Sequence, residues 1–319
     1  MKEKKIPVLC VAGPTASGKT ALSVALAKQF QGEVVSCDSM QVYRRMDIGT
    51  AKPTREERQG VPHHLIDCVD PGRVFSVAEY VRLAGEAICS IHARGHLPIV
   101  AGGTGLYMDS LLYGIDFTAN TENETIRARL QKELDSLGPD ALYRRLCERD
   151  PEASQTIHPN NRVRLVRALE MIEVSGKTLT QLKEESRQKP NPYQVLRLGL
   201  SFHNRQTLYH RIDLRVDEMM RQGLLCEAHR LYTNGFGKTA SGAIGYKELF
   251  AYFGGFSTME HCVAAIKQAT RRYAKRQGTW FRRSGDIIWL YVDEYVDSQS
   301  LFDRAFCLTE SFLQEVHKQ

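Results

Sequence analysis

The chain has 319 residues and a formal net charge of +6, with 42% hydrophobic and 25% charged residues, which excludes a disordered or fibrous protein. The length allows one large or two modest domains with a sizeable core. The longest apolar stretches are only strand-sized and the start lacks a secretion signal, so we expect neither a membrane span nor export.

Strands and helices alternate over the first hundred residues. Residues 7–13, 32–39 and 97–105 have the apolar character of buried strands, and residues 19–30 and 77–95 have the apolar spacing of helices. Strands that alternate with helices at this spacing predict a parallel sheet flanked by helices, the α/β class.

From about residue 118 the pattern becomes helical. Helical spacing recurs at 121–138, 140–157 and 161–176. We therefore expect a helical insertion within a P-loop α/β core, and the predicted domains are 1–117 (core, first part), 118–190 (insertion) and 191–319 (core, second part).

Beyond the insertion, strands return at 193–202 and 287–294, and helices are expected at 208–223 and 262–283. The tail after about residue 295 shows no pattern that we interpret. The eight cysteines include no C-x-x-C pair, which argues against a zinc module, and we expect them reduced in a cytoplasmic protein.

A phosphate-binding loop follows the first strand. Gly13, Gly18, Lys19 and Thr20 match G-x-x-x-x-G-K-[ST], with a strand before the loop and a helix after it. The backbone N–H groups and the helix dipole favour an oxyanion, Lys19 is expected on the outer phosphate, and the Thr20 hydroxyl on Mg²⁺. A plain glycine turn is the alternative. The predicted diphosphate-binding residues are Gly13, Pro14, Thr15, Ala16, Ser17, Gly18, Lys19 and Thr20.

An aspartate ends the second predicted strand. Asp38 lies at the carboxyl end of a parallel strand beside the loop, where ligands bind in open α/β sheets. The strand at 97–105 ends on glycines instead of the acid that orders the metal and water of a P-loop NTPase. A helix cap or solvated turn is the alternative for Asp38. We predict a functional carboxylate.

Several motifs follow one another in a fixed order along the chain. They are GPTASGKT (13–20), DSMQVYRRMDIGTAKP (38–53), PHHLID (62–67), AGGTGLY (101–107), HPNNRVRLVRALE (158–170), SGKTLT (175–180), RIDLRVD (211–217), AIGYKE (243–248) and KRQGTWFR (275–282). In this order they resemble the tRNA dimethylallyltransferases, also called tRNA isopentenyltransferases. The resemblance covers about residues 8–290, and the chain is similar to the bacterial form, without the zinc module of eukaryotic members. The resemblance implies transfer of a five-carbon dimethylallyl group from its diphosphate to N6 of the adenosine next to the anticodon.

For this chemistry a carboxylate must accept a proton from the adenine amino group, and Asp38 is our candidate. Cations must stabilise the departing diphosphate, which Lys19 and Thr20 with Mg²⁺ would supply. The resemblance aligns the family's catalytic arginine with Arg215, against the alternative of a surface pair with Asp213 or Asp217.

Basic residues gather near the end of the chain. Between residues 261 and 285 there are seven of them and no acid, interleaved with aromatic residues, which suits phosphate contacts and base stacking. A solvated basic face is the alternative. They are Lys267, Arg271, Arg272, Lys275, Arg276, Arg282 and Arg283.

The resemblance places further tRNA contacts in the insertion, at Arg127, Arg162, Arg164 and Arg167, and one at Thr104. The target adenine must leave its stack to reach Asp38. We expect Ser39, Met40 and Gln41 beside the extruded base.

Three other functions compete with this hypothesis. A P-loop small-molecule kinase would turn over ATP but leaves the 261–285 segment unexplained. An adenylate isopentenyltransferase shares the donor but acts on a free nucleotide and needs neither insertion nor basic helix. A non-catalytic RNA-binding module would leave the phosphate loop and Asp38 idle. We expect a monomeric enzyme that uses dimethylallyl diphosphate, the tRNA anticodon stem-loop and Mg²⁺.

Overall fold

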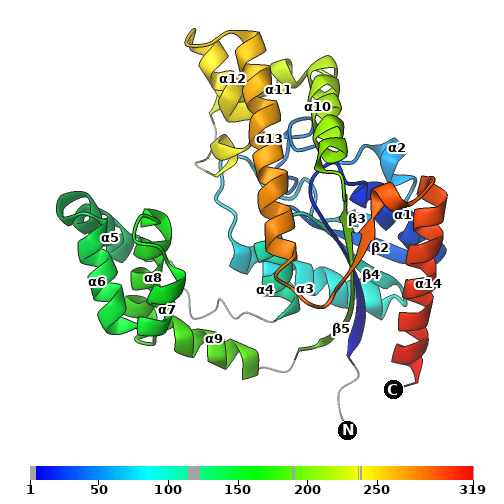
Figure 1. Ribbon diagram of the computed structural model, residues 1–319, viewed down its shortest axis with the longest axis horizontal. Helices are drawn as coiled ribbons and strands as arrows, with labels where there is room; N and C mark the ends of the chain where they lie inside the picture. Colours follow the sequence, from blue (N-terminus) through cyan, green and yellow to red (C-terminus); the bar gives the residue numbers. More distant parts are fainter. Residues whose placement is uncertain (1–4, 114–122, 189–190, 236, 238, 319) are drawn as a thin grey trace. The chain divides into compact units, whose positions relative to one another are not determined.

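The computed structural model describes residues 5–113, 123–188, 191–235, 237 and 239–318 (Figure 1). Contacts divide the chain into two compact units, Met1–Leu111 with Pro192–Gln319, and Leu112–Asn191. The domain boundaries expected at 117/118 and 190 fall on residues outside the described ones. Each unit has its own hydrophobic core.

A parallel sheet forms the centre of the larger unit, in the order β3-β2-β4-β1-β5-β6. Every neighbouring pair of these strands is parallel, which confirms the predicted α/β class. Continuous burial along β2 explains its run of apolar residues, since strands inside a covered parallel sheet have no solvent face. The strands are β1 (Ile6–Ala12), β2 (Gly32–Cys37), β3 (His63–His64), β4 (Leu97–Gly102), β5 (Tyr193–Ser201) and β6 (Ile287–Tyr291).

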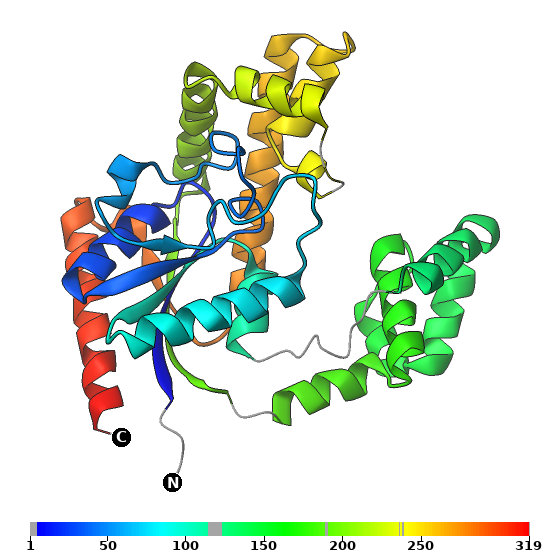
Figure 2. The ribbon, with the colours of Figure 1, turned by 180° about the vertical axis from the view of Figure 1, so that it is seen from behind.

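Helices α1 (Lys19–Gln29) and α14 (Ser298–His317) pack against each other and against the sheet. Leu22 of α1 and Leu301 of α14 belong to one buried cluster that includes residues of the strands. The tail for which the sequence suggested no pattern is therefore a long helix of the core (Figure 2). Helix α14 also contacts the residue that follows α1, because the Phe30 and Phe306 rings meet edge to face with their centroids 6.0 Å apart.

The remaining helices of the larger unit connect the strands along the chain, and three of them, α11 to α13, follow α10 before the last strand, β6. Helices α10 and α13 run side by side in both views, and ion pairs join them (Figures 1 and 2). The helices are α2 (Arg55–Arg58), α3 (Val77–Ala93), α4 (Gly105–Leu112), α10 (Arg205–Arg221), α11 (Leu224–Asn234), α12 (Tyr246–Phe253), α13 (Met259–Phe281) and two short 3₁₀ helices, Ala240–Gly242 and Val292–Glu294.

The smaller unit is helical, and its core is built of leucines at helical spacing. The prediction of one helix over 140–157 is wrong, because one helix (α6) ends at Arg149 and a second (α7) begins at Pro151. Pro151 has no N–H to continue α6, and Asp150 caps the new helix by accepting from the Ala153 nitrogen at 3.1 Å. The helices are α5 (Glu124–Leu137), α6 (Pro139–Arg149), α7 (Pro151–Thr156), α8 (Arg162–Ser175) and α9 (Leu179–Gln188).

Within the described parts of the chain, no helix is both long enough and apolar enough to span a lipid bilayer.

Candidate active site

The phosphate loop connects β1 to α1 and curls tightly. Gly13 has φ 147° and a Cβ there would lie 2.6 Å from the Leu200 carbonyl oxygen, so only glycine fits. Gly18 has φ 97°, and even Ala16 takes a positive φ of 63°. Such a run of unusual conformations turns backbone N–H groups toward one point, as an anion site requires.

Lys19 begins α1 and bends back over the loop, where its Nζ donates to the Pro14 carbonyl at 2.7 Å. Burial, together with the nearby Arg215 cation, lowers the pKa of Lys19 to about 7. A lysine whose charge is disfavoured in this way gains strongly from an anionic ligand. Phosphate binding at this loop stays a prediction, which the lowered pKa of Lys19 supports.

Arg215 reaches the same loop from α10. Its guanidinium donates to Thr15 Oγ1 at 3.5 Å and to the Ala51 carbonyl at 3.4 Å. Burial lowers the pKa of Arg215, against the opposing effects of Glu57 and Asp38. A second disfavoured cation thus adjoins the phosphate loop.

The two acids named as alternative surface partners of Arg215 form ion pairs with residues of α13 instead. Asp213 accepts from Arg271 at 2.7 Å, and Asp217 lies 2.6 Å from the Lys267 ammonium. Arg211, one turn before Arg215, instead donates from Nε to the Ala16 carbonyl at 2.9 Å. Two arginines of α10 therefore contact the phosphate loop.

Asp38 directly follows β2. Its Oδ1 accepts from the backbone nitrogens of Met40 at 2.8 Å and Gln41 at 3.3 Å, which fixes the carboxylate at the strand end. The turn alternative is thus part of the local geometry, yet the carboxylate also lines a cavity.

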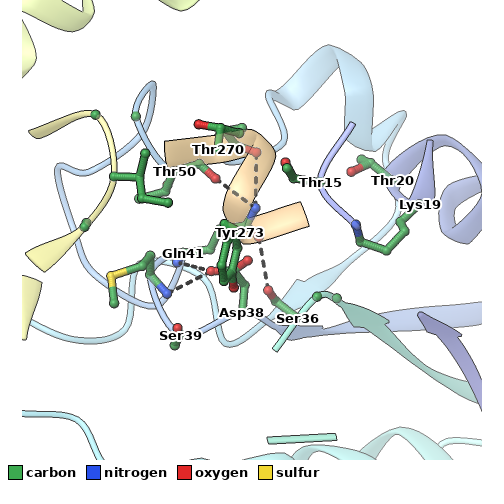
Figure 3. Close-up of a pocket in the computed structure, with 18 of the residues that line it drawn as sticks. Thr15, Lys19, Thr20, Ser36, Asp38, Ser39, Gln41, Thr50, Thr270 and Tyr273 are labelled. Atoms are coloured by element: carbon green, nitrogen blue, oxygen red, sulfur yellow. Dashed lines mark hydrogen bonds between the residues drawn. The ribbon is translucent and has the colours of Figure 1, made fainter. Parts of the chain in front are cut away.

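That cavity has a volume of about 310 Å³ and lies within the larger unit. It brings together groups from the phosphate loop, the end of β2, α10 and α13 (Figure 3). Figure 3 shows Lys19 and Thr20 on one side and Asp38 beside Tyr273. The functional side chains that line it include Thr15, Lys19, Thr20, Asp38, Ser39, Met40, Gln41, Arg215 and Tyr273.

Thr104 does not itself line the cavity, but it joins two segments that do, the turn after β4 and the residues after β2. Its Oγ1 accepts from the Ser39 nitrogen at 3.1 Å, and its own nitrogen donates to the Cys37 carbonyl at 3.2 Å. Burial, with Asp38 nearby, raises the pKa of Tyr273, whose hydroxyl also interacts with Thr104. Tyr273 therefore keeps its proton.

The Gln41 amide makes contacts with the protein itself. Its Oε1 accepts from Ser36 Oγ at 3.1 Å, and its Nε2 donates to the Thr50 and Ala51 carbonyls at 3.3 and 3.1 Å. These bonds hold the segment that passes Arg215. Contact between Gln41 and a nucleobase remains a prediction.

Sequence reasoning missed Gln277, a buried residue of α13 that also lines the cavity. Its amide joins Thr15 of the phosphate loop to Gly103 of the turn after β4. The only signal was its position in KRQGTWFR, four residues after Tyr273 and hence on the same helix face.

The basic residues of α13 divide into two groups. Lys267 and Arg271 form the ion pairs with α10, whereas Arg272 and Lys275 are exposed. Arg276 lies over the Tyr273 ring, 5.5 Å from its centroid, and lines the cavity. The exposed group is available for a polyanion.

In the smaller unit, two of the expected tRNA contacts converge on one buried acid. Arg127 and Arg167 lie 3.1 and 2.9 Å from Glu170 Oε2. Arg162 and Arg164 are exposed in the first turn of α8. Two of the four arginines are therefore held in ion pairs and two are exposed, and contact of any of them with tRNA stays a prediction.

The donor set suits Mg²⁺. The Thr20 hydroxyl and the Asp38 carboxylate offer oxygen ligands to the same cavity. Among the described residues no group of three or more His, Cys, Asp or Glu side chains forms a protein-only metal cage. Mg²⁺ usually binds through one or two protein oxygens and substrate phosphates, so the residues fit this ion.

A phosphate loop that shares one cavity with a strand-end carboxylate and with Arg215 is typical of an enzyme of the P-loop α/β class. Comparison with known proteins specifies it further. The model of the IPP transferase family matches residues 41–284, so the chain belongs to this family. Its similar relatives include proteins named tRNA dimethylallyltransferase. It is a transferase.

Relatives match over almost the whole chain. The tRNA dimethylallyltransferase of Caldanaerobacter subterraneus subsp. tengcongensis is 46% identical, with 94% of this chain and 96% of that protein covered. A crystal structure of tRNA isopentenylpyrophosphate transferase from Bacillus halodurans has a TM-score of 0.74 at 43% identity, covering 98% and 99% of the two chains. A eukaryotic dimethylallyltransferase acting on tRNA has a TM-score of 0.83 at 31% identity, covering 97% and 80%.

Proposed function

We propose that the chain transfers a dimethylallyl group from dimethylallyl diphosphate to N6 of the adenosine adjacent to the anticodon in tRNA, releasing diphosphate. The observation that carries this proposal is the single cavity onto which Asp38, the phosphate loop and Arg215 all open. One end of the cavity suits a leaving anion and the other a proton acceptor.

On the donor side, the diphosphate would lie against the loop N–H groups, Lys19, Thr20 and Arg215. As the bond between the allylic carbon and oxygen breaks, its electron pair goes to the diphosphate, and these cations and donors stabilise the charge. Mg²⁺, held by the Thr20 hydroxyl, would supply further positive charge to the diphosphate.

On the acceptor side, the lone pair of N6 forms the new bond to the allylic carbon, and Asp38 accepts the N6 proton. The Met40 and Gln41 N–H groups support this role because they hold the carboxylate at the strand end. Ser39, Met40 and Thr104 would adjoin the extruded adenine.

Binding of the anticodon stem-loop would use the exposed cations. On α13 these are Arg272, Lys275 and Arg276, and on the smaller unit Arg162 and Arg164. Arg271, Arg127 and Arg167, which are half-buried in ion pairs, would add contacts beside them. Unstacking the adenine costs a few kcal/mol, which phosphate contacts of this kind would offset. We place the enzyme in the cytoplasm, because the widely spaced cysteines suit a reducing compartment. We also expect it to act as a monomer.

The rival functions set the design of the test. The purified protein is incubated with labelled dimethylallyl diphosphate and, in separate arms, unmodified tRNA or AMP, and labelled ATP is offered for binding. We expect label transfer to tRNA alone. Transfer to AMP would support the adenylate enzyme, and tight ATP binding with turnover would support a kinase; either result contradicts the proposal.

Two variants test the assigned roles. Asp38→Asn keeps the shape but removes the proton acceptor, so kcat should fall about 10²–10⁴-fold while diphosphate still binds. Arg215→Ala should lower kcat by about 10²–10³-fold through lost stabilisation of the leaving group. Asp303→Asn, on the outer face of α14, serves as the matched control. Full activity of Asp38→Asn would contradict the assignment.

A further inference from the structure

Two sequence motifs that the proposed reaction leaves unused meet beside the cavity. They are DIGTAKP at 47–53 and AIGYKE at 243–248, and Glu227 of α11 joins them. Sequence reasoning gave Glu227 no role, and its side chain does not line the cavity.

The Glu227 carboxylate accepts from three successive backbone nitrogens. Oε2 lies 2.9 Å from the nitrogens of Asp47 and Ile48, and Oε1 lies 3.0 Å from that of Gly49. A carboxylate with several N–H donors makes charge-assisted hydrogen bonds, which are stronger than neutral ones. This part of the chain is therefore held by a side chain from far along the sequence.

Tyr246 completes the arrangement. Its hydroxyl donates to Glu227 Oε1 at 2.7 Å, and burial, with the Glu227 charge, raises the pKa of Tyr246 so that it stays a donor. A Cβ at Gly49 would lie 2.5 Å from the Tyr246 ring, so the segment passes the ring only because Gly49 has no side chain. The two motifs thus fit each other.

The held segment continues into the wall of the cavity at Gly49, Thr50 and Ala51. Ala51 has a positive φ of 50°, an unfavourable conformation for alanine that the surroundings must maintain. Its carbonyl oxygen is the one that accepts from Arg215 at 3.4 Å and from Gln41 at 3.1 Å. The direction of this carbonyl therefore affects the position of the Arg215 guanidinium.

The other side of the segment is fixed by Lys52, which is 8% exposed. Its ammonium donates to the Tyr43 carbonyl at 2.8 Å, to Asp47 Oδ1 at 2.6 Å and to Asp67. Lys52 and Glu227 are thus two anchors on either side of the strained residue.

We infer that Glu227 is a positioning residue: it fixes segment 47–51 so that the Ala51 carbonyl holds the Arg215 guanidinium at the phosphate end of the cavity. The inference rests on the proposed function of Arg215. It assigns DIGTAKP and AIGYKE to one supporting structure.

Glu227→Gln tests this role because it keeps the shape but removes the charge and sets an amide N–H against a backbone N–H. We expect kcat to fall about tenfold, with KM for tRNA changed less than about twofold, as misplacement of a leaving-group contact affects the chemical step. Glu310→Gln is the control, since it makes the same change at an exposed position of α14. Its kcat should be unchanged. An unchanged kcat for Glu227→Gln, or an equal loss in Glu310→Gln, would overturn the inference.

A cycle with Arg215→Lys separates positioning from general weakening of the fold. If Glu227 acts through Arg215, Glu227→Gln should cost less than about twofold in the Arg215→Lys background. The same tenfold loss in both backgrounds would overturn the inference while leaving the proposed function intact. A wild-type rate for Arg215→Lys alone would instead contradict the role of Arg215 in the proposed function. If circular dichroism shows that Glu227→Gln does not fold, Tyr246→Phe, which removes one donor from the same carboxylate, takes its place in the cycle.

Discussion

The side-chain oxygen of Gln277 lies 3.0 Å from the backbone nitrogen of Thr15, so a buried amide of α13 holds the phosphate loop. The amide nitrogen donates to the Gly103 carbonyl at 2.9 Å. A Cβ at Gly103 would lie 2.1 Å from that nitrogen, so the close approach depends on glycine. One side chain thereby joins the loop, the turn after β4 and the basic helix.

Replacing this amide should damage both stability and diphosphate binding. Gln277→Leu leaves the half-buried Thr15 N–H and the buried Gly103 carbonyl without their partner, which should lower the free energy of unfolding by about 2 kcal/mol. Gln277→Glu retains an acceptor for Thr15 but adds a negative charge at the cavity, so it should weaken pyrophosphate binding more than Gln277→Leu does. Urea denaturation and calorimetric titration with pyrophosphate measure the two effects. Gln299→Leu on α14 is the surface control, and tighter pyrophosphate binding by Gln277→Glu would contradict the prediction.

The low pKa of Lys19 predicts a pH dependence of diphosphate binding. Burial and Arg215 lower this pKa to about 7 in the free protein, and a bound diphosphate raises it by stabilising the ammonium. Binding then takes up a proton above pH 7, so affinity is greatest near or below pH 7 and falls by up to about tenfold per pH unit as pH rises toward the pKa of the complex.

Calorimetric titration with pyrophosphate over this range, in buffers of different ionisation enthalpy, measures both affinity and proton uptake. Lys19→Arg stays charged throughout, so its affinity should lack the loss that is due to Lys19. Because both proteins meet the same ligand ionisation, their difference isolates the lysine. Identical pH profiles would show that Lys19 does not titrate on binding.

The parts of the site with a local sequence signature were predictable. The phosphate loop needs glycines at fixed positions, and Asp38 ends an apolar run, so neither depends on distant residues for its recognition. Gln277 and Glu227 have no such signature. Each acts on backbone groups more than a hundred positions away, and only the folded chain brings these together.

Helix α14 differs from these cases, because its signal was present in the sequence. Leu301, Ala305, Phe312 and Val316 recur at helical spacing and all are buried. The charged and polar residues between them hid the pattern. Conversely, the prediction of one helix over 140–157 overlooked Pro151. Proline has no N–H to donate within a helix, so a second helix begins there.

A buried carboxylate at the start of β2 predicts how stability responds to acid. Burial alone would raise the pKa of Glu33, but hydrogen bonds from Arg94, His64 and His96 outweigh it and lower this pKa to about 2. A lowered carboxyl pKa contributes stability that is present above the unfolded value near 4.5 and is lost as pH falls toward 2.

Glu33→Gln should therefore lower the free energy of unfolding by about 2 kcal/mol at neutral pH, and the difference from the wild type should shrink as pH falls through this window. Denaturant titrations at a series of pH values measure it. Glu310→Gln, exposed on α14, is the control and should show no such trend. A difference that stays constant with pH would mean that the Glu33 charge is not what stabilises the fold.

The division of the basic helix predicts which cations determine the salt dependence of tRNA binding. Arg272 and Lys275 are exposed, so their replacement by alanine should each reduce the slope of log affinity against log salt concentration by about 0.7–0.9. Lys267 already faces Asp217 at 2.6 Å, and Lys267→Ala should change the slope much less.

Filter binding of an unmodified anticodon stem-loop over a series of KCl concentrations measures these slopes. Lys267→Ala is the matched control, because it removes the same charge from the same helix but from within an ion pair. If it reduced the slope as much as Lys275→Ala, the ion pair with α10 would have to open on binding. Phosphate contacts would then extend along the whole of α13 instead of being confined to its exposed cations.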